Sequence, residues 1–326
     1  AVQILTGEDL KLKKRIYVPD AGALEFSKDG QKLYVISGQN QVADVNIKTG
    51  KYEYLPLKGI TKDVEFSAIT VDNNGYVVLF DKGKDVRGKA YDPVSGRLMY
   101  TFGQEGGRPY DGDWEEEGLT KNVSDIAVDG NGDVWVTEDW NYPRRISKWS
   151  PSDGKLIFDL IGGTFYMGGG SGINDDDPDT VYWGPVEMKL DRENYKYKVT
   201  RILYIPDPLK GEMFPMDGGG NEIVQYFSSD ASGEMKNYAF GSGTLYIETE
   251  SGRYRPCFSI GETKKISFSS ANRTPNYDVN KTTEYAAACG RPFSGMSDGD
   301  RYLWNDLNMD GKVQEDEIKF FRFYYD

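Results

Sequence analysis

The chain has 326 residues, of which 38% are hydrophobic, and its 52 acidic and 39 basic side chains give a formal net charge of −13. This acidic balance argues against nucleic acid and anionic membrane surfaces as partners, and no apolar run approaches the roughly 18 residues of a membrane span. There is no His, which excludes His-based catalytic triads, ordinary zinc or copper sites and a self-supplied His ligand for haem.

The first half of the chain contains a repeated block in which two apolar stretches flank an Asp/Asn-Gly turn. This pattern is typical of a β-hairpin with favourable turn residues. The block occurs three times, at residues 24–35, 69–79 and 126–136. Its turn glycines are 45 and 57 residues apart and are Gly30, Gly75 and Gly132.

A second glycine turn follows each block at nearly the same distance. Its glycines, at positions 50, 96 and 154, are 46 and 58 residues apart, so the two series agree. Four strands in about 45 residues are the signature of a propeller blade. The first half therefore predicts three blades, with a long loop at 103–117 that is either a functional inter-blade loop or a solvated decoration.

The repeat becomes weaker in the second half. Residues 186–205 predict a hairpin of a fourth blade and residues 238–260 a fifth. A Gly-rich, acidic run at 162–179 lacks the ending of a phosphate loop, and its acids at 175–179 form either a second cation site or a solvated turn. Together these elements predict an all-β fold, a β-propeller of six or seven four-stranded blades that forms a single domain over residues 1–326.

The most specific motif is the segment 306–317, which matches the calcium-loop pattern D-x-[DN]-x-[DN]-G-x5-E at every specified position. Calcium takes roughly six to eight oxygen ligands. The expected ligands are Asp306, Asn308, Asp310, the Lys312 carbonyl, Gln314 and Glu317. Aromatic, β-prone residues flank the segment. We therefore expect an EF-hand-like loop between two strands of a late blade, holding a structural ion; the alternative is an acidic turn without metal.

These motifs resemble those of known propeller families. The turns at Gly75 and Gly132 are similar to NHL and gluconolactonase-like repeats, and the string from Leu303 to Glu317 resembles a calcium-loop blade of large secreted propeller proteins from planctomycete-type bacteria. Within that group, the chain resembles the β-subunits of hydrazine synthases from anammox bacteria in its size and in its lack of a haem motif. Hydrazine synthases form hydrazine from nitric oxide and ammonium. This resemblance implies multihaem cytochrome subunits as partners and no haem bound by this chain. It also implies an extracytoplasmic location, periplasm-like or in the anammoxosome lumen.

No nucleophile constellation or cofactor motif is recognisable, which favours a non-catalytic structural or assembly subunit with Ca²⁺ as its cofactor. Its partners would be other protein subunits, contacted through the loops between blades. Exposed aromatic and Arg side chains are frequent anchors of such contacts. The first candidates for partner binding are Arg253, Tyr254 and Arg255.

Two other functions remain open. A metal-dependent, lactonase-like hydrolase would hold a divalent ion on the propeller axis and use it to activate water. Its candidate ligands, near the starts of innermost strands, are Glu25 or Glu65, Asp125, Glu187 and Asn221. A carbohydrate- or peptide-binding propeller would instead use aromatic loops as a binding platform.

The two cysteines, Cys257 and Cys289, are not spaced as C-x-x-C, so thiolate metal sites and c-type haem attachment are excluded. They form either one disulfide, in an oxidising compartment, or two buried thiols. The chain begins with Ala1 and has no initiator Met, which agrees with a cleaved leader and equally with a recombinant start.

Overall fold

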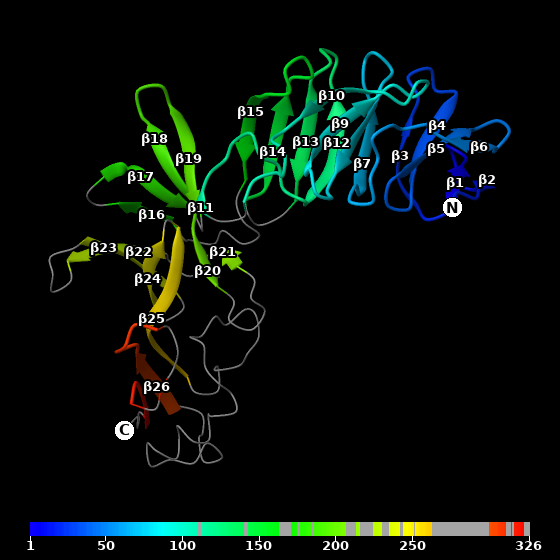
Figure 1. The fold of residues 1–326 in the computed structure, drawn as a ribbon. Coiled ribbons are helices and arrows are strands. Elements are labelled where there is room, and N and C mark those ends of the chain that lie inside the picture. Colours follow the sequence, from blue (N-terminus) through cyan, green and yellow to red (C-terminus); the bar gives the residue numbers. More distant parts are fainter. Residues whose placement is uncertain are drawn as a thin grey trace. The chain divides into compact units, whose positions relative to one another are not determined.

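The computed structural model describes residues 1–109, 112–139, 143–162, 171–174, 177–183, 186–206, 213–215, 224–229, 235–241, 244–250, 252–262, 300–310, 314 and 316–322. Every regular element in these ranges is a β-strand (Figure 1), which confirms the all-β class. The chain divides into two compact units. The first comprises Ala1–Pro109 and Glu115–Gly162, and the second comprises Tyr110–Trp114 and Gly163–Asp326. A single domain over residues 1–326 stays a prediction.

The first unit contains one hairpin and three four-stranded antiparallel sheets in which consecutive strands are neighbours. The hairpin pairs β1 (Val2–Leu5) with β2 (Leu12–Ile16). The first sheet consists of β3 (Ala21–Phe26), β4 (Lys32–Ser37), β5 (Gln41–Asn46) and β6 (Tyr52–Tyr54). The second consists of β7 (Phe66–Val71), β8 (Val77–Asp81), β9 (Arg87–Tyr91) and β10 (Leu98–Phe102). The third consists of β12 (Val123–Val128), β13 (Val134–Glu138), β14 (Arg145–Trp149) and β15 (Leu156–Ile161). The three repeats read from the sequence are therefore confirmed as four-stranded sheets.

The turn glycines are required by backbone geometry. Gly75 has φ 86°, in the left-handed region that glycine adopts without strain. Gly96 has φ 69°, and a Cβ atom there would lie 1.8 Å from the Pro56 carbonyl oxygen. The repeated glycines of the sequence therefore mark turns that a larger residue would distort.

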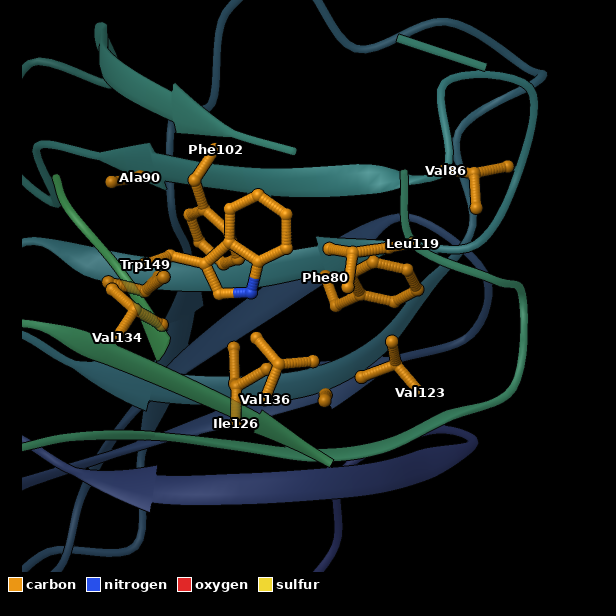
Figure 2. Packing of buried hydrophobic residues seen from close by; sticks show 12 residues of the cluster. Phe80, Val86, Ala90, Phe102, Leu119, Val123, Ile126, Val134, Val136 and Trp149 are labelled. Carbon is orange, nitrogen blue, oxygen red and sulfur yellow. The ribbon is translucent and has the colours of Figure 1, made fainter. Parts of the chain in front are cut away.

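Strand β8 shows how the sheets of the first unit pack. All five of its residues are buried, and successive side chains of a strand point to opposite faces. Val77 and Leu79 join the apolar cluster that includes residues of β4 in the first sheet. Val78 and Phe80 join a second cluster with Trp149 of the third sheet (Figure 2). The middle sheet is thus apolar on both faces, and adjacent sheets are joined by contacts between side chains.

The long loop before the third sheet is fixed by buried charged groups. Arg145 donates a hydrogen bond from Nη1 to the Gly118 carbonyl oxygen at 2.9 Å. Oε1 of Glu138 accepts hydrogen bonds from the Thr120 backbone N–H at 2.9 Å and from its hydroxyl at 2.7 Å, and it lies 3.4 Å from Nη2 of Arg108. Because Arg108 is buried too, this loop is anchored to the sheet at that residue, while several of its other described residues are exposed, and a function of the loop stays a prediction.

The second unit contains two larger sheets. The first has the order β11-β19-β18-β17-β16. Its strands are β11 (Gly112–Asp113), β16 (Ser171–Asn174), β17 (Asp177–Trp183), β18 (Val186–Asp191) and β19 (Lys196–Ile202). The other contains β20 (Tyr204–Pro206), β21 (Met213–Pro215), β22 (Val224–Ser229), β23 (Met235–Gly241), β24 (Thr244–Glu250), β25 (Arg253–Glu262), β26 (Asp300–Asn305) and β27 (Ile318–Arg322).

Strands β22 to β27 follow one another as antiparallel neighbours. The segments predicted as the fourth and fifth blades are therefore strands, but in the described residues they belong to a five-stranded and an eight-stranded sheet. A total of six or seven separate four-stranded blades stays a prediction. The part of the chain that the structure describes contains no helix able to cross a membrane.

Candidate metal centre

The predicted calcium loop connects β26 to β27, which pair antiparallel. Trp304 and Ile318 form the last register pair before the loop, and both are buried. The Asn305 N–H donates to the Glu317 carbonyl oxygen at 3.0 Å, and the Asp306 N–H donates to the Cys257 carbonyl oxygen on β25 at 2.9 Å. The two ends of the loop are therefore held by the sheet, as the β-prone flanks predicted.

The carboxylates at the first and last loop positions are both only 4% exposed. Oε1 of Glu317 accepts from the Leu307 N–H at 2.9 Å, while its Oε2 lies 3.3 Å from the indole Nε1 of Trp304. Oδ1 of Asp306 accepts from the Asp310 N–H at 3.0 Å, and its Oδ2 accepts from Arg255 at 2.8 Å. Both carboxylates are thus oriented by donors from the loop and from the sheet beneath it.

Amide oxygens complete the described loop. Oδ1 of Asn308 accepts from the Asp310 N–H at 3.0 Å. Nε2 of Gln314 donates to Oδ2 of Asp310 at 2.8 Å, but Oε1 of Gln314 is buried and has no hydrogen-bond partner. A buried oxygen without a donor costs free energy unless a water or an ion satisfies it. Gln314 is the residue expected at loop position 9.

The loop's ligand chemistry fits a hard cation, because its side-chain donors are all oxygens. Among the described residues, however, no group of three or more His, Cys, Asp or Glu side chains is arranged to hold a metal ion. Gly311, Lys312 and Val313 lie outside the described residues, so the expected carbonyl ligand at Lys312 stays a prediction. The described loop offers two oriented, buried carboxylates together with amide oxygens.

The three residues expected to anchor a partner have different environments. Arg253 is exposed, with a 48% exposed side chain that pairs with Glu250 at 3.1 Å. Tyr254 is 1% exposed and packs among Tyr182, Leu203 and Tyr246, so the expectation that it is exposed is wrong. Successive residues of a strand point to opposite faces. Tyr254 therefore points into the core, whereas the residues before and after it in the chain, Arg253 and Arg255, point to the other face. Arg255 is directed to the calcium loop, and partner binding by this segment stays a prediction.

A buried ionic cluster lies between the two sheets of the second unit, and sequence reasoning did not identify it. Arg201 of β19 donates from Nε to Oε1 of Glu187 on β18 at 2.9 Å and also pairs with Glu248 of β24. Burial opposes ionisation of Glu187, but the hydrogen bond and charge of Arg201 hold its pKa below the usual value. Glu248 of this cluster also accepts a hydrogen bond on Oε1 from the Gly252 N–H at 2.8 Å.

The candidate ligands of a lactonase-like site are engaged in other contacts. Glu187 belongs to the ionic cluster, and Glu65 pairs with Lys82 at 2.8 Å. Glu25 accepts from the N–H of its neighbour Phe26 at 2.7 Å, and Asp125 likewise accepts from the N–H that follows it, at 2.9 Å. Asn221 lies outside the described residues.

The remaining sequence expectations concern acids and thiols. In the 175–179 cluster, Asp177 pairs with Lys189 and Asp179 pairs with Arg192 at 2.7 Å; positions 175 and 176 lie outside the described residues. Cys257 is a buried free thiol 3.5 Å from the Leu245 carbonyl oxygen, and burial raises its pKa to about 11. Its predicted partner Cys289 is not among the described residues, and the disulfide stays a prediction that the free thiol of Cys257 does not support.

No family model matches the chain, and the curated proteins contain no match to it. Among solved structures, the chain is similar to hydrazine synthase from Kuenenia stuttgartiensis, with 14% identity and a TM-score of 0.34 over 75% of this chain and 67% of that one. It is also similar to a gluconolactonase from Xanthomonas campestris, with 12% identity and a TM-score of 0.33 over 75% and 77%. A protein of unknown function from Bacteroides caccae has 11% identity and a TM-score of 0.37 over 77% and 87%. Likeness at this level carries no argument about ligands, activity or partners.

Proposed function

We propose that the chain is a non-catalytic, calcium-binding β-propeller of six or seven blades that serves as an assembly subunit of a larger extracytoplasmic complex. The calcium part rests on the loop between β26 and β27. The observation that carries it is the buried Oε1 of Gln314, which lacks a hydrogen-bond partner at a position where a calcium loop supplies a ligand.

The ion would link the two strands of the β26–β27 hairpin. The first and last loop carboxylates, Asp306 and Glu317, lie at the ends of the two strands and are buried. A cation that binds both carboxylates would hold the strand ends together. Because the unfolded chain does not bring these carboxylates together, the cation would bind the folded protein only. Such binding stabilises by about 2.7 kcal/mol when the free calcium concentration is a hundredfold above the Kd.

Terbium luminescence with calcium competition tests the calcium site. The Trp304 indole touches Glu317, so Tb³⁺ in the loop should be sensitised by excitation of this Trp and displaced by Ca²⁺. Glu317→Gln should abolish calorimetric calcium binding. The matched control is Asp316→Asn, which removes one charge from the adjacent, exposed side chain and should retain binding. Absence of both the terbium signal and calcium heat in the unmodified protein would contradict the site.

The assembly part rests on the lack of a catalytic constellation. The sequence has no His, and the described carboxylates considered for a hydrolytic metal site are bound to neighbouring donors instead. In line with the sequence resemblance, the partners we propose are multihaem cytochrome subunits of a redox complex of the hydrazine synthase type, with no haem on this chain.

Native mass spectrometry of the protein purified from its source tests this assembly. Co-purification with multihaem subunits in a fixed stoichiometry is the expected result. A lone monomer carrying calcium would contradict the assembly role and leave the calcium site intact, and a lactone-hydrolysis screen would then be the next measurement.

A further inference from the structure

The β1–β2 hairpin, near the N-terminus in Figure 1, has both buried and exposed apolar residues. Val2 and Ile16 are register partners, and both are buried in the apolar cluster of the first sheet. Leu5 and Leu12 are also register partners, but they are 44% and 52% exposed. Because register partners have Cβ atoms about 4.5–5.5 Å apart, these two leucines form one exposed apolar pair on a hairpin that is anchored to the sheet.

Leu10, at the turn of the same hairpin, is 71% exposed and has φ 53°. This left-handed conformation is unfavourable for a residue with a Cβ atom. The turn is fixed by the Thr6 N–H, which donates to the Lys11 carbonyl oxygen at 2.9 Å, and by the Lys11 N–H, which donates to the Thr6 hydroxyl oxygen at 3.0 Å. A strained and largely exposed leucine adds little to the stability of the fold, so a contact outside the fold explains it better.

The hairpin is also basic within an acidic chain. Its acids are Glu8 and Asp9, and Asp9 pairs with Lys11 at 2.7 Å. Lys14 donates to the Lys48 carbonyl oxygen at 2.9 Å, which holds a turn with further lysines beside the hairpin. The exposed cations of the hairpin and this turn that form no ion pair with a described carboxylate are Lys13, Arg15, Lys48 and Lys51. The exposed charge around the leucines is therefore predominantly positive, although the whole chain has a net charge of −13.

We propose that the β1–β2 hairpin is an interaction surface for a partner protein that presents an acidic segment with interspersed apolar side chains. Leu5, Leu10 and Leu12 would contact the apolar side chains, and the surrounding cations would pair with the carboxylates. This inference rests on the proposed assembly role and names the chemistry of the partner's contact surface. An extended polyanion, such as nucleic acid or an anionic bilayer, matches the hairpin less well, because the remaining surface of this acidic chain repels it.

The test begins with peptide selection on the full chain. A phage-displayed library of short random peptides is depleted on the Leu12→Ser/Lys13→Glu double variant and then selected on the unmodified protein. The peptides that remain depend on the hairpin, and they should contain more Asp and Glu than Lys and Arg, together with apolar residues. The absence of such peptides, or the selection of basic ones, would overturn the proposal.

Fluorescence anisotropy with a selected peptide then measures the part played by charge. Lys13→Glu should weaken binding about tenfold at low ionic strength and by less at high salt, because salt screens exposed charges. The matched control Lys121→Glu makes the same charge change at another exposed position of the first unit and should stay within about twofold. Equal losses in the two variants would show that the net charge of the chain governs binding, and the hairpin would lose its role.

Leu10→Gly separates binding from folding. It removes the exposed side chain and relieves the left-handed backbone, so the midpoint of thermal unfolding should stay the same or rise by up to about 3 °C. The affinity for the selected peptide should fall about fivefold. A lower midpoint would assign Leu10 to the fold, and an unchanged affinity would exclude it from the interaction surface; either result contradicts the proposal.

Phosphatidylserine vesicles and single-stranded DNA are the competing probes. If either one bound through the hairpin while acidic peptides did not, a partner protein would be the wrong class of partner. A lone monomer in native mass spectrometry would contradict the assembly role itself, which is a different result from the failure of hairpin-dependent peptide binding.

Discussion

The two units of this chain both combine apolar clusters with ion pairs, but their ion pairs connect different parts of the fold. In the first unit, apolar clusters of twelve and nine buried residues lie between successive four-stranded sheets. Ion pairs of this unit join neighbouring strands of one sheet, as Lys89 does with Asp81 and Arg145 with Glu138. In the described part of the second unit, a cluster of four buried residues accompanies the pair of Arg201 with Glu248 in the other sheet and the pair of Arg255 with Asp306 in the calcium loop. Apolar burial is tolerant of sequence details, whereas a buried ion pair depends on each partner. The comparison therefore teaches that apolar contacts join successive sheets where the sequence repeat is regular, and that where the repeat weakens an ion pair of Arg201 also joins two sheets.

The largest expected effect comes from removing the core side chain Trp149 of the first unit. It is fully buried and packs against Phe102 at a ring-centroid distance of 6.0 Å. Trp149→Ala should lower the free energy of unfolding by about 3–5 kcal/mol, measured by denaturant titration, with hydrogen exchange to locate the loss in the third sheet. The control Val94→Ala, at an 86% exposed position, should stay within about 0.5 kcal/mol. A small loss at Trp149 would break the comparison.

Removing Arg201 should have a similar or slightly smaller effect on the second unit. Arg201→Met leaves Glu187 and Glu248 in the cluster without their cation, so we expect a loss of about 3–5 kcal/mol, measured in the same way. Arg192→Met removes an exposed pair with Asp179 and should cost at most about 1 kcal/mol. Equal effects of the two substitutions would show that the ionic cluster is not a stabilising element.

The pH dependence of the second unit should report the same cluster. Arg201 lowers the pKa of Glu187 despite the opposing effect of burial. The unfolded chain therefore binds the proton first as the pH falls, so the stabilisation is complete above the ordinary pKa of 4.5 and is lost as the pH drops through the lower folded-state value. Denaturation at pH 3 to 7 should show this acid limb, and Glu187→Gln should flatten it. Glu250→Gln, at a 69% exposed side chain, should leave it unchanged.

The smallest effect concerns the backbone of the calcium loop. Met309 has φ 61°, a left-handed conformation that is unfavourable for a residue with a Cβ. Met309→Gly should stabilise the folded loop by up to about 1 kcal/mol, because the relief of strain exceeds the entropy that glycine adds to the unfolded chain. Thermal unfolding measures it. Leu307→Gly, in the same exposed loop without positive φ, should instead be destabilising, and equal shifts would exclude backbone strain as the cause.

The accuracy of sequence reasoning differed between the two units for a physical reason. Turn glycines such as Gly75 and alternating apolar strands are local signals, and they located the three sheets of the first unit. The loop between β26 and β27 was also recognisable, because its spacing is contained in twelve consecutive residues. Arg201 and Glu248 are 47 residues apart and Arg255 and Asp306 are 51 apart, and nothing in the local sequence indicates that these residues meet.

The sequence by itself therefore determined the all-β class, the three repeats of the first half and the oxygen-rich loop, because strand alternation, turn residues and ligand spacing are short-range properties. Only the tertiary structure decided the roles of three charged or aromatic residues that sequence reasoning had grouped as surface anchors. Arg253 is exposed, Tyr254 is in the core and Arg255 is paired with Asp306. Alternation along β25 separates Tyr254 from its neighbours, and the pairing of β25 with β26 brings Arg255 to the loop. Strand pairing across about 50 residues, which no local pattern encodes, makes Arg255 part of the proposed metal site.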